Sequence, residues 1–322
     1  MRALIVHNQR SGFGSDAIFE FERALVRRGD ECVLRLMDDS PAEAFVTDAE
    51  EFDLVVASGG DGTVSSILHA LAGRDVLTCV FPSGTANLLF ANIGNATEPA
   101  ALARACRMGS AASLDLGEMG WFQDDGSWHT RGFSLMAGTG FDATIMQAAL
   151  PIKPTLGQAA YFAAALANMD PKLEHYTITV DGTTYERDGI SCIIANNAMI
   201  QADIEIVPDC RMDDGLLEAI VLEPSDAAQR ARTIFAGLLD PSGKNVGRPH
   251  IECFKGAHIT VESNRPIPLE IDGDVMGVSV THYEARVIPG AVNIIVDGAS
   301  RYSTGDNHDA RFGGAEQIAY PE

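Results

Sequence analysis

The chain has 322 residues, and 46% of them are hydrophobic, so it is long enough to bury a sizeable core and to form two domains. Its formal net charge of −22 repels nucleic-acid phosphates and anionic lipid headgroups unless positive charge is gathered locally. We therefore expect no nucleic-acid partner. If a phosphorylated ligand binds, backbone amides and a divalent cation must do much of what lysines usually do.

The start of the chain and its cysteines indicate a cytoplasmic protein. The opening segment, MRALIVHNQR, turns polar after an apolar stretch that is too short for a secretory signal. The longest apolar run, AAYFAAALA at 159–167, has about half the length that a membrane-spanning helix needs. The six cysteines include no Cys-x-x-Cys pair, which favours reduced thiols over a zinc site or a disulfide framework.

Residues 1 to about 117 alternate short apolar runs with helical patterns. The expected strands are ALIVH, CVLRLM, DLVVAS and LTCVF, and the expected helices lie near 15–28, 41–48 and 62–72. This alternation predicts a parallel sheet covered by helices.

From about residue 128 onward, short strand-like runs bounded by turn residues predominate, which predicts a β-sandwich or barrel. The runs are TRGFSLMAG, HYTITV, ISCIIANN, LLEAIVLE, HIECF, HITVES, PLEIDG, VSVTHYEARVI and AVNIIV. Helical patterns near 141–149, 156–168 and 224–239 interrupt them. The residues after Val296 are polar and glycine-rich, which predicts a mobile tail.

Three glycines surround one aspartate in the segment VVASGGDGTVSSIL, residues 55–68. A strand that ends at Ser58 and a helix that begins near Thr63 would leave unpaired amides at a helix N-terminus. An anion gains hydrogen bonds and a favourable dipole there. The alternative interpretation is a tight turn capped by Asp61 or Thr63, without a ligand.

A second glycine-centred turn, PSGTANLLFANIG at 82–94, favours the anion site over that alternative. It carries hydroxyls at Ser83 and Thr85 and an amide at Asn87. Loops at the carboxyl ends of parallel strands share one edge of the sheet. We therefore expect this turn, the GGDG turn and the segment NQRSGFG at 8–14 to line one crevice.

Seven motifs, in one order along the chain, resemble the diacylglycerol kinase catalytic-domain family, which includes bacterial soluble lipid kinases and relatives of sphingosine kinases. They are NQRSG (8–12), GGDGT (59–63), PSGTAN (82–87), LDLG (114–117), AGTGFDA (137–143), PDCRMDDGLLE (208–218) and IDGD (271–274). The resemblance covers residues 2–297. It implies an α/β + β fold, in which a three-layer α/β domain related to those of NAD kinases and phosphofructokinases precedes a β-sandwich. We expect a nucleotide-binding domain over 1–117, a lipid-substrate domain over 118–297 and a polar tail over 298–322.

The resemblance also implies roles for individual residues. Asp274, where the family usually has glutamate, would be the catalytic base, and Asp61 would help to place the phosphates and their metal. Asp214 would bind a structural Mg²⁺ together with the backbone carbonyls of Arg211 and Leu216, and oxygen ligands suit such a hard cation. Ordinary turns remain the alternatives for Asp214 and Asp274. The expected ATP-binding residues are Asn8, Ser11, Gly12, Gly59, Gly60, Asp61, Gly62, Thr63, Gly84, Thr85 and Asn87.

Taken together, the motifs predict a kinase that uses ATP and Mg²⁺ to phosphorylate a lipid hydroxyl. A NAD kinase-like phosphotransferase acting on a soluble hydroxyl and a non-catalytic nucleotide-binding module are the alternatives. We expect a cytoplasmic protein that associates transiently and peripherally with membranes, and exposed sheet edges in the second domain favour a homodimer. The run at 159–167 favours a core helix, and the alternative interpretation is an apolar lip, formed together with Leu156, through which a lipid enters. The local cationic cluster would include Lys153, Lys172, Lys244 and Arg248.

Overall fold

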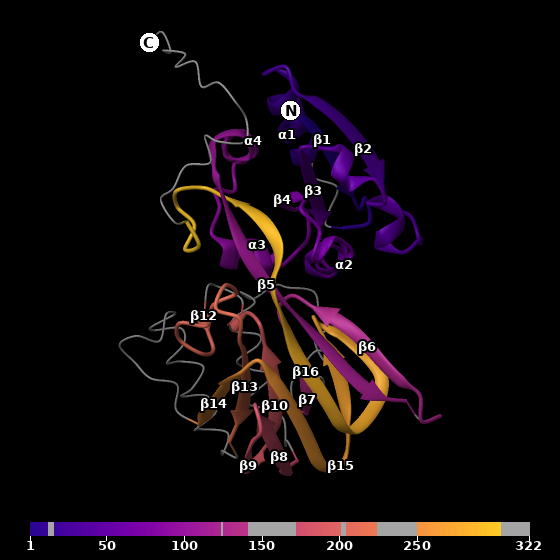
Figure 1. The fold of residues 1–322 in the computed structure, drawn as a ribbon, viewed down its shortest axis with the longest axis vertical. Coiled ribbons are helices and arrows are strands. Elements are labelled where there is room, and N and C mark those ends of the chain that lie inside the picture. The colour runs from indigo at the N-terminus through magenta and orange to yellow at the C-terminus, as the bar shows by residue number, and fades with distance from the viewer. Residues whose placement is uncertain (12–15, 124, 141–171, 201–203, 224–249, 304–322) are drawn as a thin grey trace, which may run out of the picture. The chain divides into compact units, whose positions relative to one another are not determined.

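A computed structural model describes residues 1–11, 16–123, 125–140, 172–200, 204–223 and 250–303 (Figure 1). The chain divides into two compact units, the first made of residues 1–114 together with those from 292 onward, and the second made of residues 115–291. The expected domain boundaries differ from this division at residues 115–117, which fall in the second unit, and at residues 292–297, which fall in the first. The second difference arises because residues 292–296 end a long strand that pairs inside the first unit.

The first unit is built on a parallel sheet. Its strands lie in the order β16-β4-β3-β1-β2, and every neighbouring pair is parallel. Residues 3–6 and 54–57, in the two central strands, are fully buried, so both faces of the sheet are covered. The strands are β1 (Arg2–His7), β2 (Glu31–Leu36), β3 (Leu54–Gly59), β4 (Leu77–Pro82) and the end of β16 (Asp274–Val296).

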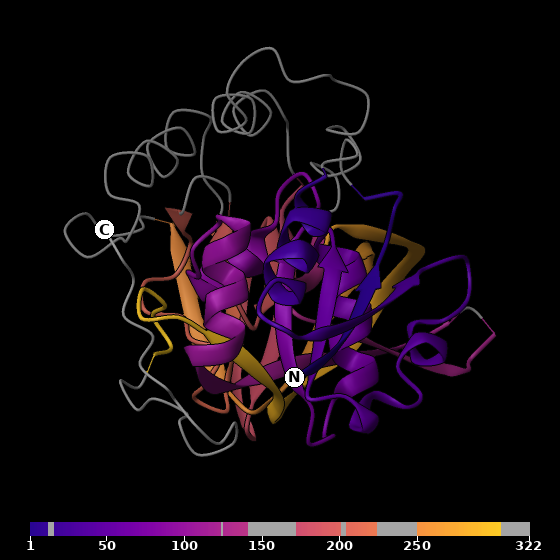
Figure 2. The ribbon, with the colours of Figure 1, turned by 90° about the horizontal axis from the view of Figure 1, so that it is seen from above.

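Helices cover this sheet because each has one apolar face. In α1 (Ala17–Val26), Ile18, Phe21 and Leu25 are buried at the spacing of a single helix face. Helix α1 packs with α4 (Pro99–Met108), and α2 (Asp61–Leu71) packs with β3 and the 3₁₀ helix η1 (Ala42–Phe45). In Figure 2 the indigo-to-purple helices of this unit lie around its strands. The remaining helices are α3 (Leu88–Ile93) and the 3₁₀ helix η2 (Ala49–Glu51).

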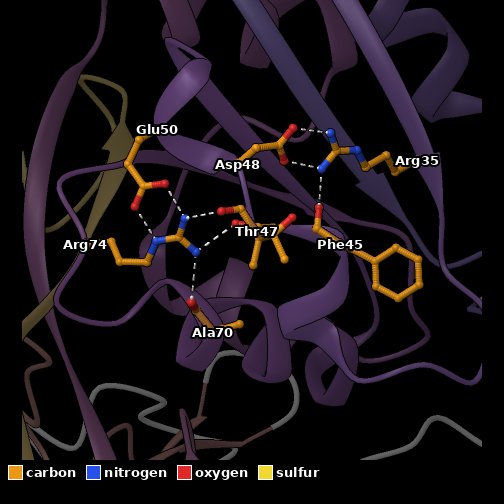
Figure 3. A network of polar contacts seen from close by, with 8 residues as sticks. Arg35, Phe45, Thr47, Asp48, Glu50, Ala70 and Arg74 are labelled. Carbon is orange, nitrogen blue, oxygen red and sulfur yellow. Dashed lines mark hydrogen bonds and ion pairs between the residues drawn. The ribbon is translucent and has the colours of Figure 1, made fainter.

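Two arginines hold the connection between β2 and β3 (Figure 3). Arg35 pairs with both oxygens of Asp48, at 2.6 and 2.7 Å, and donates to the Phe45 carbonyl at 2.8 Å. Arg74 pairs with Glu50 and donates to the Val46 carbonyl at 2.8 Å. Arg74 follows the C-terminal end of α2, so these contacts tie that end of the helix to the connection. The opposite end of α2 is the glycine-rich turn.

The second unit is a β-sandwich in which β15 (His258–Ile271) takes part in two sets of strands. Its residues 269–271 pair with β7, whereas residues 259–263 pair with β8, and the register shifts between these stretches. One set runs β14-β13-β10-β7-β15, and the other joins β9, β8, β15, β16, β5 and β6. The other bounds are β5 (Ser110–Phe122), β6 (Trp128–Phe133), β7 (Met136–Gly140), β8 (Glu174–Val180), β9 (Thr183–Gly189), β10 (Ser191–Ala195), β13 (Leu217–Leu222) and β14 (Ile251–Gly256); β11 (Met199–Ile200) and β12 (Ile204–Glu205) pair with each other.

One apolar core joins both sets of strands. Tyr176 and Ile178 from β8 are buried in the same cluster as Cys192 and Ile194 from β10. Every second residue of β8 is buried, which is the period of a strand with one face toward a core. The predicted α/β domain followed by a β-sandwich is thus confirmed. The helical patterns predicted at 141–149, 156–168 and 224–239 lie outside the described residues.

The end of the described chain packs into the first unit. The hydroxyl of Tyr302 donates to Asn92 Oδ1 at 2.6 Å, and that of Ser300 donates to the Ile93 carbonyl at 2.5 Å. Both donors are buried, so this part of the expected tail, 298–303, is anchored rather than free. In the part of the chain that the structure describes, each helix is too short or too polar to cross a bilayer.

Candidate functional site

The two glycine-rich turns of the first unit touch each other through their backbones. A Cβ atom added to Gly84 would lie 2.4 Å from the Cα of Gly60 and 2.9 Å from Asn87 Oδ1. A Cβ added to Gly60 would lie 3.4 Å from the Cα of Gly84. Any side chain at Gly84 would therefore push the turns apart, so glycine is required there for close approach. The prediction that these two turns lie together at one edge of the sheet is confirmed, and the crevice that they would line with residues 8–14 stays a prediction.

The turn after β3 leads directly into α2, which begins at Asp61, two residues before the expected start. Gly60 caps the helix in an extended conformation, with φ −80° and ψ 175° and without a side-chain cap. The amides of the first helical turn lack partners within the helix, so they point out of its N-terminal end. The aspartate of the motif is therefore the first residue of α2 rather than part of the turn.

Polar side chains connect this turn with the loop after β1. Asn8 Nδ2 donates to Thr63 Oγ1 at 2.8 Å, and the hydroxyls of Ser11 and Thr63 lie 3.4 Å apart. These three residues carry no net charge, so they offer hydrogen bonds to a phosphate without adding a fixed cation. Gly12, which was also expected to bind ATP, lies outside the described residues.

Asp61 and Asn87 fix the second turn relative to the first. Asp61 Oδ1 accepts a hydrogen bond from the Leu89 amide at 3.0 Å, at the start of α3. Asn87 adopts a left-handed backbone conformation, with φ 51°, and its side chain binds both the amide and the carbonyl of Gly84, at 2.8 and 2.9 Å. Among the remaining expected residues, Gly59 is buried under Thr63, whereas Gly62 and Thr85 are exposed.

A buried polar chain lies beneath these turns and was not found from the sequence. His7 Nδ1 lies 2.9 Å from Ser58 Oγ, which lies 2.9 Å from Ser83 Oγ. His7 is the last residue of β1, Ser58 lies within β3 and Ser83 follows β4. These hydrogen bonds therefore link three neighbouring strands. Burial lowers the pKa of His7, although its hydrogen bond to Ser58 opposes the shift. The only sequence signal was a histidine directly before Asn8.

The expected catalytic base, Asp274, is the first residue of β16 in the second unit. It follows a two-residue turn, Asp272-Gly273, in which both residues have positive φ. The Asp272 carboxylate accepts hydrogen bonds from the amides of residues 134–136, so Asp272 is the turn anchor. Asp274 is exposed instead, and its Oδ2 lies 2.6 Å from a guanidinium nitrogen of Arg131. The partner arginine was not found from the sequence.

The loop that contains Asp214 is held by the buried Asp115. The two oxygens of Asp115 accept from the amides of Gly215 and Gly290, each at 2.7 Å, and the Asp115 amide donates to the Met212 carbonyl at 2.6 Å. Burial raises the pKa of Asp115, and these two hydrogen bonds to its carboxylate oppose the shift. Asp115 belongs to the motif LDLG, but the sequence alone had assigned it no role.

The side chains around Asp214 differ from those expected of a magnesium site. Asp214 Oδ1 accepts from the Leu216 amide at 3.1 Å, and Oδ2 lies 2.6 Å from the ammonium of Lys255. Arg211, whose carbonyl was expected to bind the metal, pairs through its side chain with Asp213. Partial burial alone would lower the pKa of Lys255, but its hydrogen bonds to Asp214 and Glu218 raise it overall. An ammonium thus already neutralises the carboxylate that was expected to bind the ion.

Sequence profiles of two domains match the chain. The diacylglycerol kinase catalytic domain matches residues 2–119, and the YegS C-terminal NAD kinase beta sandwich-like domain matches residues 136–296. The two matches fall on the two units of the fold.

Individual proteins agree with these profiles. A protein from Stenotrophomonas maltophilia named "Probable lipid kinase YegS-like" is 27% identical over 268 residues, which cover 80% of this chain and 84% of the relative. A diacylglycerol kinase from Mycobacterium tuberculosis is 29% identical over 235 residues, covering 69% of this chain and 74% of the relative.

Two solved structures share the fold. A diacylglycerol kinase from Bacillus anthracis str. Sterne superposes with a TM-score of 0.65 at 17% identity, covering 93% of this chain and 98% of that chain. Yeast NADH kinase superposes with a TM-score of 0.51 at 11% identity, covering 92% of this chain and 84% of that chain.

Proposed function

Since the chain belongs to the diacylglycerol kinase catalytic-domain family, a kinase family with YegS-like members, we propose that it transfers the γ-phosphate of ATP to the hydroxyl of a lipid. The observation that carries the proposal is the backbone contact between Gly60 and Gly84. It joins two turns that carry no side chain at Gly60 or Gly84, and the N-terminal amides of α2 and the uncharged donors Asn8 and Thr63 lie beside them. A triphosphate fits this arrangement in a chain whose net charge is −22.

In this proposal, the first unit holds the nucleotide. Backbone amides at the start of α2 bind phosphate oxygens, and Asn8, Ser11 and Thr63 add neutral hydrogen bonds. Asp61, next to these amides, is the carboxylate suited to orient the Mg²⁺ that accompanies ATP. When bound, this ion neutralises charge that develops on the transferred phosphoryl group. The glycines around it admit the phosphates without a steric penalty.

The second unit supplies the acceptor side of the reaction. We assign Asp274 as the base that takes the proton from the lipid hydroxyl, because it is an exposed carboxylate at the end of a rigid turn. Arg131 orients that carboxylate through its contact with Oδ2. Lipid substrates reside in bilayers, so we also propose transient contact with a membrane surface. The expected apolar lip lies outside the described residues, as do Lys153, Lys244 and Arg248 of the cationic cluster.

A transfer assay with γ-labelled ATP tests the proposal. The purified chain would be incubated with a panel of lipids that carry primary hydroxyls, with NAD, and with buffer alone. We expect label in the lipid phase and none in NAD. Label transferred to NAD would identify a kinase for soluble substrates, and ATP binding without transfer to any acceptor would identify a nucleotide-binding module. Either of these results would contradict the lipid kinase.

A further inference from the structure

The loop of residues 210–216 and the start of β13, in the second unit, bring two carboxylates to a single ammonium group. Lys255 Nζ lies 2.6 Å from Asp214 Oδ2 and 3.0 Å from Glu218 Oε1. The Glu218 side chain is only 2% exposed, so its charge needs a partner inside the protein. The other carboxylate oxygen of Glu218 contacts the thiol of Cys210 at 3.0 Å. The ammonium therefore bridges the loop and the strand that follows it.

Strand pairing dictates the position of this ammonium. In the antiparallel pair of β13 and β14, Glu218 and Lys255 are directly opposite partners. Opposite charges at facing positions of neighbouring strands attract each other across a short and fixed separation. The strand register therefore places the Lys255 side chain beside Glu218, and in this position its ammonium also contacts Asp214 on the loop.

The same geometry disfavours a divalent cation at Asp214. Both oxygens of Asp214 already accept from a donor, one from the Leu216 amide and the other from Lys255. Mg²⁺ demands oxygen ligands at about 2.0–2.1 Å in a nearly octahedral arrangement, and the ammonium 2.6 Å from Asp214 Oδ2 would repel such an ion.

We propose that Lys255 is the built-in cation of this loop, and that the second unit keeps its structure without a bound divalent ion. Magnesium would then be needed for the nucleotide alone. The inference goes beyond the proposed kinase activity and does not depend on it, because the fold can be measured without ATP or lipid. A transfer assay without product would contradict the proposed kinase activity but not this inference.

Thermal unfolding of the full chain tests this inference in the absence of nucleotide. After chelation, we expect the same melting temperature with and without millimolar MgCl₂. A structural ion present at about a hundred times its dissociation constant would instead raise the melting temperature by about 5–10 °C. Such a rise, if Asp214→Asn abolished it, would overturn the proposal.

Replacing the ammonium gives a second, independent test. Lys255→Met should lower the melting temperature, because Asp214 and Glu218 then face each other without a cation. MgCl₂ should recover part of that loss, because two carboxylates are oxygen ligands of the kind that hard cations prefer. The double variant Lys255→Met/Asp214→Asn should melt above Lys255→Met alone, since it removes one of the two repelling charges.

A matched control separates this effect from the loss of any positive charge. Arg187 forms an ion pair with Glu252 on the same strand as Lys255, and Arg187→Met removes a cation that faces only one carboxylate. We expect this variant to gain no stabilisation from MgCl₂. Unchanged stability of Lys255→Met, or a double variant that melts below it, would show that Lys255 does not close the loop.

Discussion

The two units place charge in different ways. The turn cluster of the first unit offers backbone amides and the neutral side chains of Asn8 and Thr63. The corresponding features of the second unit are carboxylates that each contact a cation, as in the pairs Asp214–Lys255 and Asp274–Arg131. In a chain of net charge −22, the first unit thus presents dipoles where an anion is proposed to bind, and these two acidic side chains of the second unit each have a cationic partner. The first arrangement suits binding of ATP, and the second suits handling of a proton.

The sharpest way to separate these two roles is to remove the carboxylate at position 274. Asp274→Ala should lower turnover by about 10²- to 10⁴-fold, the range typical of a lost general base, while ATP affinity stays close to that of the wild type. Single-turnover kinetics would measure the transfer step, and calorimetry would measure ATP binding. Glu262→Ala, which removes another exposed carboxylate of the second unit, is the control and should leave both unchanged.

The companion variant Asp274→Glu asks whether the shorter side chain limits the reaction. Glutamate is the residue that the family usually has here, and it extends the carboxylate by about one carbon–carbon bond. Faster phosphoryl transfer by Asp274→Glu would indicate that the aspartate carboxylate reaches the lipid hydroxyl poorly. Slower transfer would indicate that Arg131 already positions the shorter carboxylate correctly. Transfer by the alanine variant at nearly the wild-type rate would reject Asp274 as the base.

The complementary experiment disturbs binding and leaves the second unit intact. Gly84→Val should weaken ATP binding on the order of 100-fold, because its Cβ would displace the backbone of Gly60 and separate the turns. Gly298→Val is a control in the same unit, since a Cβ there meets no atom within 4 Å. Calorimetry on both folded variants measures the difference. Equal ATP affinity in the two would mean that the paired turns do not hold the phosphates.

A smaller effect is expected where the end of the chain anchors to the first unit. Tyr302→Phe removes the hydrogen bond to Asn92 and leaves a buried oxygen without its donor, which should cost about 1–3 kcal/mol of unfolding free energy. Urea unfolding would measure the change. Tyr185→Phe, at a partly exposed ring stacked on Phe254, should change the stability by no more than about 0.5 kcal/mol. If the two variants unfold alike, the C-terminal contact does not stabilise the unit.

Local patterns were sufficient to predict most of the fold and the paired turns. The apolar runs and glycine turns report on neighbours in sequence, and parallel strands bring their carboxyl ends to one edge by geometry. The position of both turns at one edge therefore followed from the order of the elements, whereas the direct contact of Gly60 with Gly84 was not predicted. The start of α2 was misjudged by two residues, because Gly60 caps the helix through its backbone and leaves no side-chain signal.

Contacts that depend on long-range register could not be predicted from one sequence. Arg131 and Asp274 are 143 residues apart, and only the pairing of β5 with β6 and β16 brings their regions together. The pairing of Lys255 with Glu218 likewise depends on how β14 aligns with β13. The packing of the end of β16 onto β4, which moves residues 292–296 into the first unit, has the same origin.

The smallest expected effect concerns pH and takes opposite signs in the two units. Burial lowers the pKa of His7 below its ordinary value of 6.5, so the unfolded chain binds its proton more readily. The stability that neutral His7 contributes is therefore present above pH 6.5 and is lost as the pH falls through its folded pKa. In the second unit, the hydrogen bond to Asp188 raises the pKa of the exposed His175 above 6.5. Its contribution is complete below pH 6.5 and is lost as the pH rises through the folded pKa.

Two matched variants measure this difference. Unfolding free energies of the wild type, His7→Gln and His175→Gln would be compared between pH 5 and pH 8. Other groups titrate equally in all three chains, so only differences between the curves count. Relative to the wild type, His7→Gln should lose less stability on acidification, because no proton enters the buried chain beneath the turns. His175→Gln should instead lose more stability than the wild type on acidification. The difference should be smaller than for His7→Gln, because His175 and its carboxylate partners are exposed to water. Parallel curves for the wild type and His7→Gln would mean that this ring binds its proton equally in both states.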